Sequence, residues 1–360
     1  MIGIVDADLI GRKRHRFPNL ALEKIAGFFK EREEVRLITD YDEIRSNRRA
    51  YNRIYMGKVF TDTPVPEDIF RYDIIGGGTG FYFDKAIPLP CEIEHHMPDY
   101  HLYDNCNLIK PYDRKEYDEC SIGFLTRGCF RGCPFCVNQH YHRSRKWSEL
   151  KEFMDNDKKR LCFLDDNFLA CKDWKEILKE VISTGKPFKF KQGLDERILT
   201  DEKAEMLFNS KYDGRFTFAF DNIKDFPIIE EKLKLALKYT KGKRLVFYTL
   251  CAFDWKGTWD KSFWAKDIHD LMTRINYLTD HGAYPYVMRF KKYLEAPEPY
   301  KSMYINIARW CNQPNLLKKM SFQKLVMRDR EHGKALQMYT DYIDLNKNQW
   351  KLFQHEYCEG

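Results

Sequence analysis

The sequence has no apolar run that approaches the roughly 20 residues needed to cross a bilayer as a helix. Its first residues, MIGIVDADLIGRKRHR, contain no long apolar stretch preceded by basic residues, so we expect no secretory signal peptide there. Internal repeats and low-complexity tracts are also missing. With 11 cysteines in 360 residues, cysteine is too sparse and odd in number for a disulfide scaffold. We therefore expect no membrane partner and a reducing, cytoplasmic location.

The composition is that of a soluble globular protein, with 43% apolar and 32% charged residues. A chain of 360 residues is long enough for two domains and a sizeable core. The formal net charge of +7 suits an anionic partner such as nucleic acid or a nucleotide, and it suits a solvated basic surface equally well.

The strongest local signal is the stretch IGFLTRGCFRGCPFCVNQH, residues 122–140. An apolar strand is expected over 122–126, and three thiols follow it at Cys129, Cys133 and Cys136. Three thiolates on so short a loop can converge on one metal centre. Because a lone triplet leaves a fourth coordination position open, the pattern is typical of a reactive site rather than a structural one.

This C-x3-C-x2-C triplet resembles the signature of radical S-adenosylmethionine (SAM) enzymes, and Phe135 before the last cysteine fits that pattern. The resemblance implies that the three cysteines hold three irons of a 4Fe-4S cluster and that SAM chelates the fourth. It further implies an external electron donor such as flavodoxin or ferredoxin, and a 5′-deoxyadenosyl radical that takes hydrogen from a substrate. The substrate class stays open among nucleic acid, nucleotide, peptide and small molecule.

A second interpretation of the same loop is a structural zinc site. His140 and His142 follow Cys136 closely enough for Cys129, Cys133, Cys136 and His140 to form a closed tetrahedral set. The protein would then be a zinc-stabilised nucleic-acid-binding protein without catalysis.

Residues 1–83 predict a Rossmann-like domain with a parallel sheet. The expected strands are 2–5, 35–39, 53–60 and 72–81, with a helix at 19–30 that Asn19 caps. The fourth stretch runs into a glycine-rich turn, where Gly76, Gly77 and Gly78 would let the backbone approach a ligand closely. This order resembles the cobalamin-binding domain that precedes many radical SAM cores. The D-x-H-x-x-G motif of some cobalamin domains is absent, so bound cobalamin and an empty domain are both left open.

Residues 84–120 have little periodicity and predict an interdomain linker. They contain Cys91, Cys106 and Cys120. Methylthiotransferases, which this layout resembles, use three further cysteines for a second cluster, so a second cluster is an additional hypothesis.

Residues 121–312 predict a partial (β/α)6 TIM barrel, the fold of the radical SAM family. The expected strands are 122–126, 161–165, 188–193, 215–220, 244–250 and 284–290. The expected helices are 147–155, 173–183, 201–209, 228–239, 266–280 and 300–311. Residues 313–360 are charged and predict a helical C-terminal extension, in which Leu325, Met338 and Tyr342 would cover the open side of the barrel.

Polar residues end these strands, where chemistry gathers in such barrels. By resemblance, Asp165, Asp166 and Asn167 would receive the amino group of SAM. At the end of the third strand and just beyond it, Gln192, Asp195 and Arg197 would reach the ribose of SAM, its carboxylate or the substrate. Asp221 would accept hydrogen bonds from the ribose hydroxyls. The adenine would stack on the apolar sixth strand, which includes Met288. The expected reaction is of methyltransferase, methylthiotransferase, oxidoreductase or isomerase type, with methylation favoured if cobalamin binds.

Overall fold

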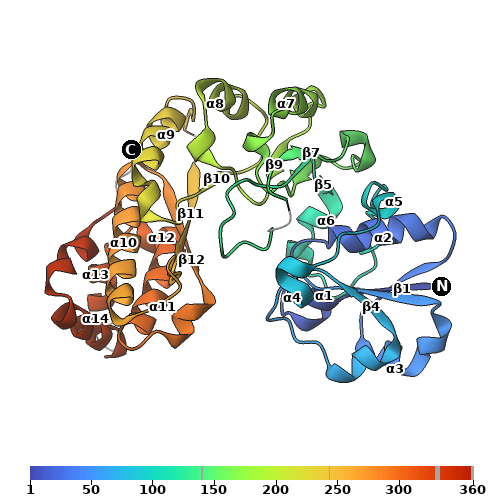
Figure 1. The fold of residues 1–360 in the computed structure, drawn as a ribbon, viewed down its shortest axis with the longest axis horizontal. Helices are drawn as coiled ribbons and strands as arrows, with labels where there is room; N and C mark the ends of the chain where they lie inside the picture. The colour runs from blue at the N-terminus through green and yellow to red at the C-terminus, as the bar shows by residue number, and fades with distance from the viewer. Residues whose placement is uncertain (139–140, 243, 329–332, 358–360) are drawn as a thin grey trace. The chain divides into compact units, whose positions relative to one another are not determined.

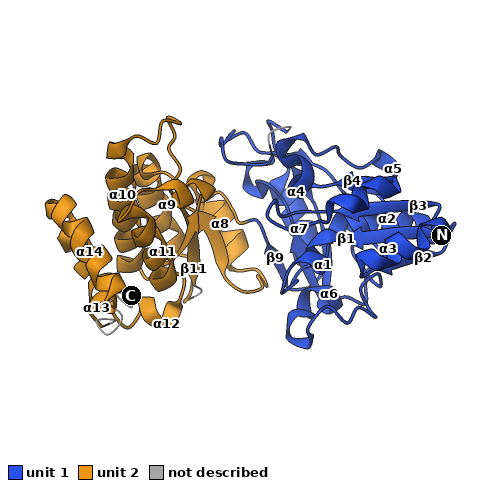
Figure 2. Ribbon diagram, turned by 90° about the horizontal axis from the view of Figure 1, so that it is seen from below, with its two compact units in different colours: residues 1–192 blue, residues 193–360 orange. Residues whose placement is uncertain are grey.

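The computed structural model describes residues 1–138, 141–242, 244–328 and 333–357 (Figure 1). The chain divides into two compact units, residues 1–192 and residues 193–360 (Figure 2). Each unit contains parallel β-sheet and helices, so the fold is mixed α/β, as the sequence predicts.

The first unit begins with a four-stranded parallel sheet of order β2-β1-β3-β4. Its strands are β1 (Ile2–Asp6), β2 (Val35–Ile38), β3 (Arg53–Gly57) and β4 (Ile74–Gly77). Its helices are α1 (Ala7–Gly11), α2 (Leu20–Lys30), α3 (Tyr41–Asn47) and α4 (Thr79–Tyr82). All four strands and the long helix lie where the sequence predicts them, and the Asn19 side chain caps α2 by accepting from the backbone N–H of Leu22.

Every residue of β1 is buried because both faces of the sheet are covered at this strand. Ile2 and Ile4 point to one face and pack with Ile25 of α2. Val5 points to the other face and packs with Ile44 of α3. This alternation follows from the two-residue period of a strand, and Figure 1 shows α2 and α3 on opposite sides of the sheet.

The segment 84–120, which the sequence predicts as a linker, belongs to the core of the first unit. It forms two short helices, α5 (Cys91–Glu94) and α6 (Lys115–Glu119). Tyr100, Tyr103 and Tyr117 are buried. The Tyr100 hydroxyl accepts from the backbone N–H of Ile122 at 2.8 Å and donates to the carbonyl of Phe153 at 2.7 Å. The segment therefore fastens neighbouring parts of the unit together.

A second parallel sheet in the first unit has the order β5-β8-β9. Its strands are β5 (Cys120–Gly123), β8 (Arg160–Phe163) and β9 (Phe188–Phe190), and helix α7 (Trp174–Ser183) precedes β9. The strand predicted at 122–126 ends early, since Leu125 and Thr126 donate their backbone N–H groups to Asp165 instead of a neighbouring strand.

The prediction of a helix at 147–155 is wrong. A single 3-10 turn, Leu150–Glu152, occupies the centre of this segment. Tertiary contacts fix both of its ends: the Trp147 indole donates to Glu94 at 3.0 Å, and Phe153 is buried against the backbone of Gly123. These contacts leave room for one turn only.

The second unit contains a three-stranded parallel sheet of order β10-β11-β12. Its strands are β10 (Phe216–Ala219), β11 (Leu245–Cys251) and β12 (Tyr284–Arg289). Its helices are α8 (Asp201–Phe208), α9 (Phe226–Leu237), α10 (Lys261–Asp280), α11 (Tyr300–Cys311), α12 (Pro314–Leu317), α13 (Phe322–Arg328) and α14 (Lys334–Leu345). The three strands and the helices α8 to α11 match the prediction in order and approximate position.

The C-terminal residues form helices, as predicted, and share the core of the second unit. Leu325, Met338 and Tyr342 are buried in one cluster with Trp310 of α11 and Ile275 of α10. None of the helices in the described ranges combines the length and apolar character needed to span a bilayer.

We predict that Gly78→Ala destabilises the first unit, whereas Gly77→Ala does not. Gly78 has a φ of +100°, and a Cβ there would lie 2.3 Å from the carbonyl oxygen of Lys58. A Cβ on Gly77 would meet nothing within 4 Å. The first substitution should lower the free energy of unfolding by about 2 kcal/mol or more.

Urea unfolding followed by circular dichroism measures this difference, with Gly77→Ala as the matched control. Equal stability of the two variants would show that the close approach of Lys58 is not what requires a glycine at position 78.

Candidate functional site

The three predicted thiols lie on a loop that starts at a two-stranded antiparallel ribbon. Strand β6 (Thr126–Arg127) pairs with β7 (Arg145–Lys146). Residues 128–138 leave this ribbon and are called the cysteine loop below. Gly128 has a φ of +100°, and a Cβ there would lie 2.2 Å from the carbonyl oxygen of Arg143. Together with the 2.9 Å hydrogen bond from the Cys129 N–H to the Tyr141 carbonyl, this close approach fixes the start of the loop.

Asp165, just beyond the carboxyl end of β8, binds the chain that enters the ribbon. Its carboxylate accepts the backbone N–H of Thr126 at 2.7 Å, the Thr126 hydroxyl at 2.6 Å and the Leu125 N–H at 3.2 Å. The side chain is fully buried, and burial raises the pKa of Asp165 to about 7 despite these donors. Asp165 is therefore a positioning group for the ribbon.

The next two residues continue the same pattern along the cysteine loop. Asp166 accepts the Gly128 N–H at 2.7 Å and a hydrogen bond from the Asn138 side-chain amide. The Asn167 amide donates to the sulfur of Cys129 at 3.4 Å. Three consecutive side chains after β8 thus contact the ribbon, the loop backbone and one of its thiols.

The sulfurs also receive backbone donors from within the loop. The Arg131 N–H lies 3.5 Å from the Cys129 sulfur, and the Asn138 N–H lies 3.4 Å from the Cys136 sulfur. Burial raises the pKa of the Cys136 thiol, and the nearby Asp166 and Cys129 add to this effect. All three thiols are half-buried.

Among the described residues, no group of three or more His, Cys, Asp or Glu side chains is arranged to hold a metal ion. His140 of the predicted zinc set lies outside the described residues, and His142 is exposed. Phe135 is half-buried within the loop.

The other predicted SAM-contacting residues lie at strand ends elsewhere. Gln192 is exposed at the end of the first unit. In the second unit, Arg197 donates to Asp195 and to Asp225, each at 2.7 Å, so its guanidinium already bridges two carboxylates.

Asp221 accepts the backbone N–H of Leu250 at 3.1 Å, and burial raises its pKa while the buried Arg274 opposes the shift. The Met288 side chain is 44% exposed on β12. Asp195, Arg197, Asp221 and Met288 therefore all belong to the second unit, and the structure uses the first three in contacts within that unit.

Two further predicted sets have structural explanations. Gly78 allows close approach of the Lys58 backbone, as described above, while Gly76 and Gly77 lie in β4. The three cysteines proposed for a second cluster are not brought together. Cys91 is exposed, and Cys106 and Cys120 are buried in separate core clusters.

Sequence analysis missed Thr126 and Asn138 as parts of the site. In the sequence, Thr126 is only the last residue of the expected strand at 122–126, and Asn138 has no local signal beyond its place two residues after Cys136. Both act through Asp165 and Asp166, which are close to them only in the folded chain.

A scan of the sequence against models of known protein families found no match, and a search of curated proteins found none either.

We predict that Asp165 makes stability fall as the pH rises from about 5 to about 8. Its folded-state pKa of about 7 lies above its ordinary value of 3.8, so the folded protein holds this proton more tightly than the unfolded chain. The resulting stability is fully present below the unfolded pKa and is lost as the pH rises through the folded one.

Relative to Asp165→Asn, the wild-type free energy of unfolding should drop by about 2 kcal/mol over this interval. Urea unfolding at the two pH values measures the difference. The control is Asp157→Asn, which changes an exposed carboxylate and should keep the wild-type dependence of stability on pH. Parallel pH profiles for the wild type and Asp165→Asn would contradict the assignment.

Proposed function

We propose that this protein is a radical SAM enzyme whose 4Fe-4S cluster is held by Cys129, Cys133 and Cys136. One observation carries the proposal: three consecutive side chains after β8 support a C-x3-C-x2-C loop from its entry to its first thiol. A loop built only to close a turn would not need two buried polar side chains, Asp165 and Asn167, and the half-buried Asp166 to support it.

The donor chemistry fits such a cluster. Thiolates are the usual protein ligands of iron–sulfur clusters, and hydrogen bonds to their sulfurs tune the reduction potential. Here the Asn167 amide and two backbone N–H groups already donate to the sulfurs of Cys129 and Cys136. Loading must draw the three sulfurs together, which is the usual coupling between metal binding and local folding.

When bound, the cluster supplies the electron that cleaves SAM to a 5′-deoxyadenosyl radical, as the resemblance implies. The residues of this chain have positioning tasks. Asp165 fixes the ribbon, and Asp166 fixes the loop at Gly128 and Asn138. Because these acceptors are engaged, we propose Asp165 and Asp166 as positioning residues rather than direct contacts of the SAM amino group. The substrate, cobalamin binding and the SAM contacts of the second unit remain predictions.

We predict that Ser substitution of any one of Cys129, Cys133 and Cys136 abolishes SAM cleavage. The measurement is 5′-deoxyadenosine formed from SAM under dithionite by anaerobically reconstituted protein, together with its iron and sulfide content. The wild type should be brown and active, and each of the three variants should lose iron and activity, because a hydroxyl is a poor cluster ligand.

Cys91→Ser is the matched control, since Cys91 is exposed and lies outside the cysteine loop. It should keep full cluster content. Colourless wild-type protein with one equivalent of zinc would overturn the proposal in favour of the zinc-stabilised alternative.

A further inference from the structure

A basic segment of the first unit lines a cavity that the proposed function does not use. Residues 11–16, called the basic loop, start at the last residue of α1, the short helix that follows the carboxyl end of β1, and lead toward α2. The basic loop lines a cavity of about 580 Å³ together with Phe17, Phe60, Asp62 and Pro64. This size is typical of ligand-binding pockets, and ligands of open parallel sheets bind beyond the carboxyl ends of the strands.

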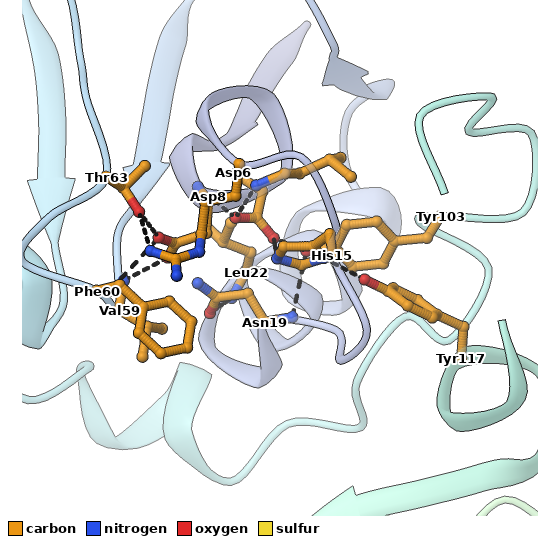
Figure 3. A network of polar contacts seen from close by, with 12 residues as sticks. Asp6, Asp8, His15, Asn19, Leu22, Val59, Phe60, Thr63, Tyr103 and Tyr117 are labelled. Atoms are coloured by element: carbon orange, nitrogen blue, oxygen red, sulfur yellow. Dashed lines mark hydrogen bonds and ion pairs between the residues drawn. The ribbon is translucent and has the colours of Figure 1, made fainter. Parts of the chain in front are cut away.

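Buried polar contacts anchor the centre of the basic loop (Figure 3). His15 is only 9% exposed, its Nε2 lies 3.4 Å from the carboxylate of Asp6, and its Nδ1 is hydrogen-bonded to the Tyr117 hydroxyl. The Tyr103 hydroxyl donates to the same Asp6 carboxylate at 2.8 Å. The flanking Arg14 and Arg16 have side chains that are 43% and 62% exposed.

Asp8 anchors the opposite wall of the cavity. Its buried carboxylate accepts the backbone N–H of Val59 at 2.6 Å, that of Phe60 at 3.4 Å and the hydroxyl of Thr63. Figure 3 shows Asp6 and Asp8 side by side, each reaching toward a different loop. Two buried carboxylates therefore hold both walls in place.

Positive charge is in excess on this surface. Arg14 and Arg16 share one carboxylate, Asp113. Arg12 pairs with Asp62, whose side chain is 75% exposed, so water screens that pair strongly. Lys13 is exposed and has no ion-pair partner among the described residues.

Two exposed aromatic rings alternate with these cations. Phe60 is 50% exposed, and the Arg12 guanidinium lies 4.3 Å from its ring centre. Tyr112 is 71% exposed, and the Arg14 guanidinium lies 4.9 Å from its ring centre. Alternating cations and accessible rings are the combination that binds single-stranded nucleic acid, in which cations contact phosphates and rings stack on bases. An acidic peptide would use the cations and leave the rings exposed to water.

We propose that the basic loop and its cavity bind single-stranded nucleic acid, with phosphates on Lys13, Arg14 and Arg16 and a base on Phe60. The proposal rests on contacts within the first unit and is independent of the proposed radical chemistry.

The test is fluorescence anisotropy of the full chain with labelled 12-nucleotide oligouridylate and oligothymidylate. Lys13→Gln/Arg16→Gln should weaken binding about tenfold or more at moderate salt. It should also lower the slope of log affinity against log salt by about 1.4, since each lost phosphate contact contributes about 0.7 for single strands. Tighter binding of the uridylate would indicate contact with the ribose, and equal binding would indicate that phosphates and bases suffice; both results support the site.

The matched control is Arg49→Gln/Lys151→Gln, which removes the same charge from two exposed positions outside the basic loop and should change affinity less than about twofold. Phe60→Leu should weaken binding about tenfold through lost stacking. Equal affinity of the two double variants would overturn the proposal. Tighter binding of duplex than of single strands would also overturn it. So would a competition experiment in which polyglutamate displaces the labelled strand as well as oligouridylate of the same total charge does.

Discussion

The hydrogen bonds to the Asp165 carboxylate are the contacts on which the candidate site depends. A fully buried carboxylate has lost its hydration, and the three donors from Leu125 and Thr126 replace it. Hydrogen bonds to a charged group contribute roughly 1.5–3 kcal/mol each. These hydrogen bonds direct the chain out of the sheet after β5 and into the ribbon. The cysteine loop starts from that ribbon.

The same arrangement recurs beyond other strand ends. In the first unit, Asp6 ends β1 and contacts His15 of the basic loop, and Asp8 of α1 holds the 59–63 segment. In the second unit, Asp221 follows β10 and accepts from the backbone of Leu250, and Asp267 of α10 accepts from that of Ala252. Buried carboxylates thus orient the loops on which ligand contacts of parallel sheets are usually found.

The sequence predicted the strands well because buried parallel strands are continuous apolar runs. It predicted α2 and α7 to α11 from apolar periodicity and caps such as Asn19. It failed where tertiary contacts decide local structure. The single turn at Leu150–Glu152 replaced a helix because Trp147 and Phe153 are held by distant groups. The buried tyrosines of residues 84–120 have no regular spacing that would distinguish them from a linker.

The candidate site was predictable in part. The spacing of the thiols marks the loop, and the polar residues after β8 mark a strand end, but neither pattern reveals that the two meet. Asp165 and Thr126 are 39 residues apart, and a hydrogen bond across that separation leaves no local trace in the sequence. The sequence therefore predicts the acidic pair as ligand contacts, and the structure shows its carboxylates hydrogen-bonded to the ribbon and to the cysteine loop.

Electron paramagnetic resonance of the anaerobically reduced protein, recorded with and without SAM, tests the central claim most directly. If three cysteines hold the cluster and its fourth iron is open, the reduced-cluster signal should be present and should change shape when SAM binds. A signal that SAM leaves unchanged would mean that a protein side chain already occupies the fourth position, and this result would contradict the account.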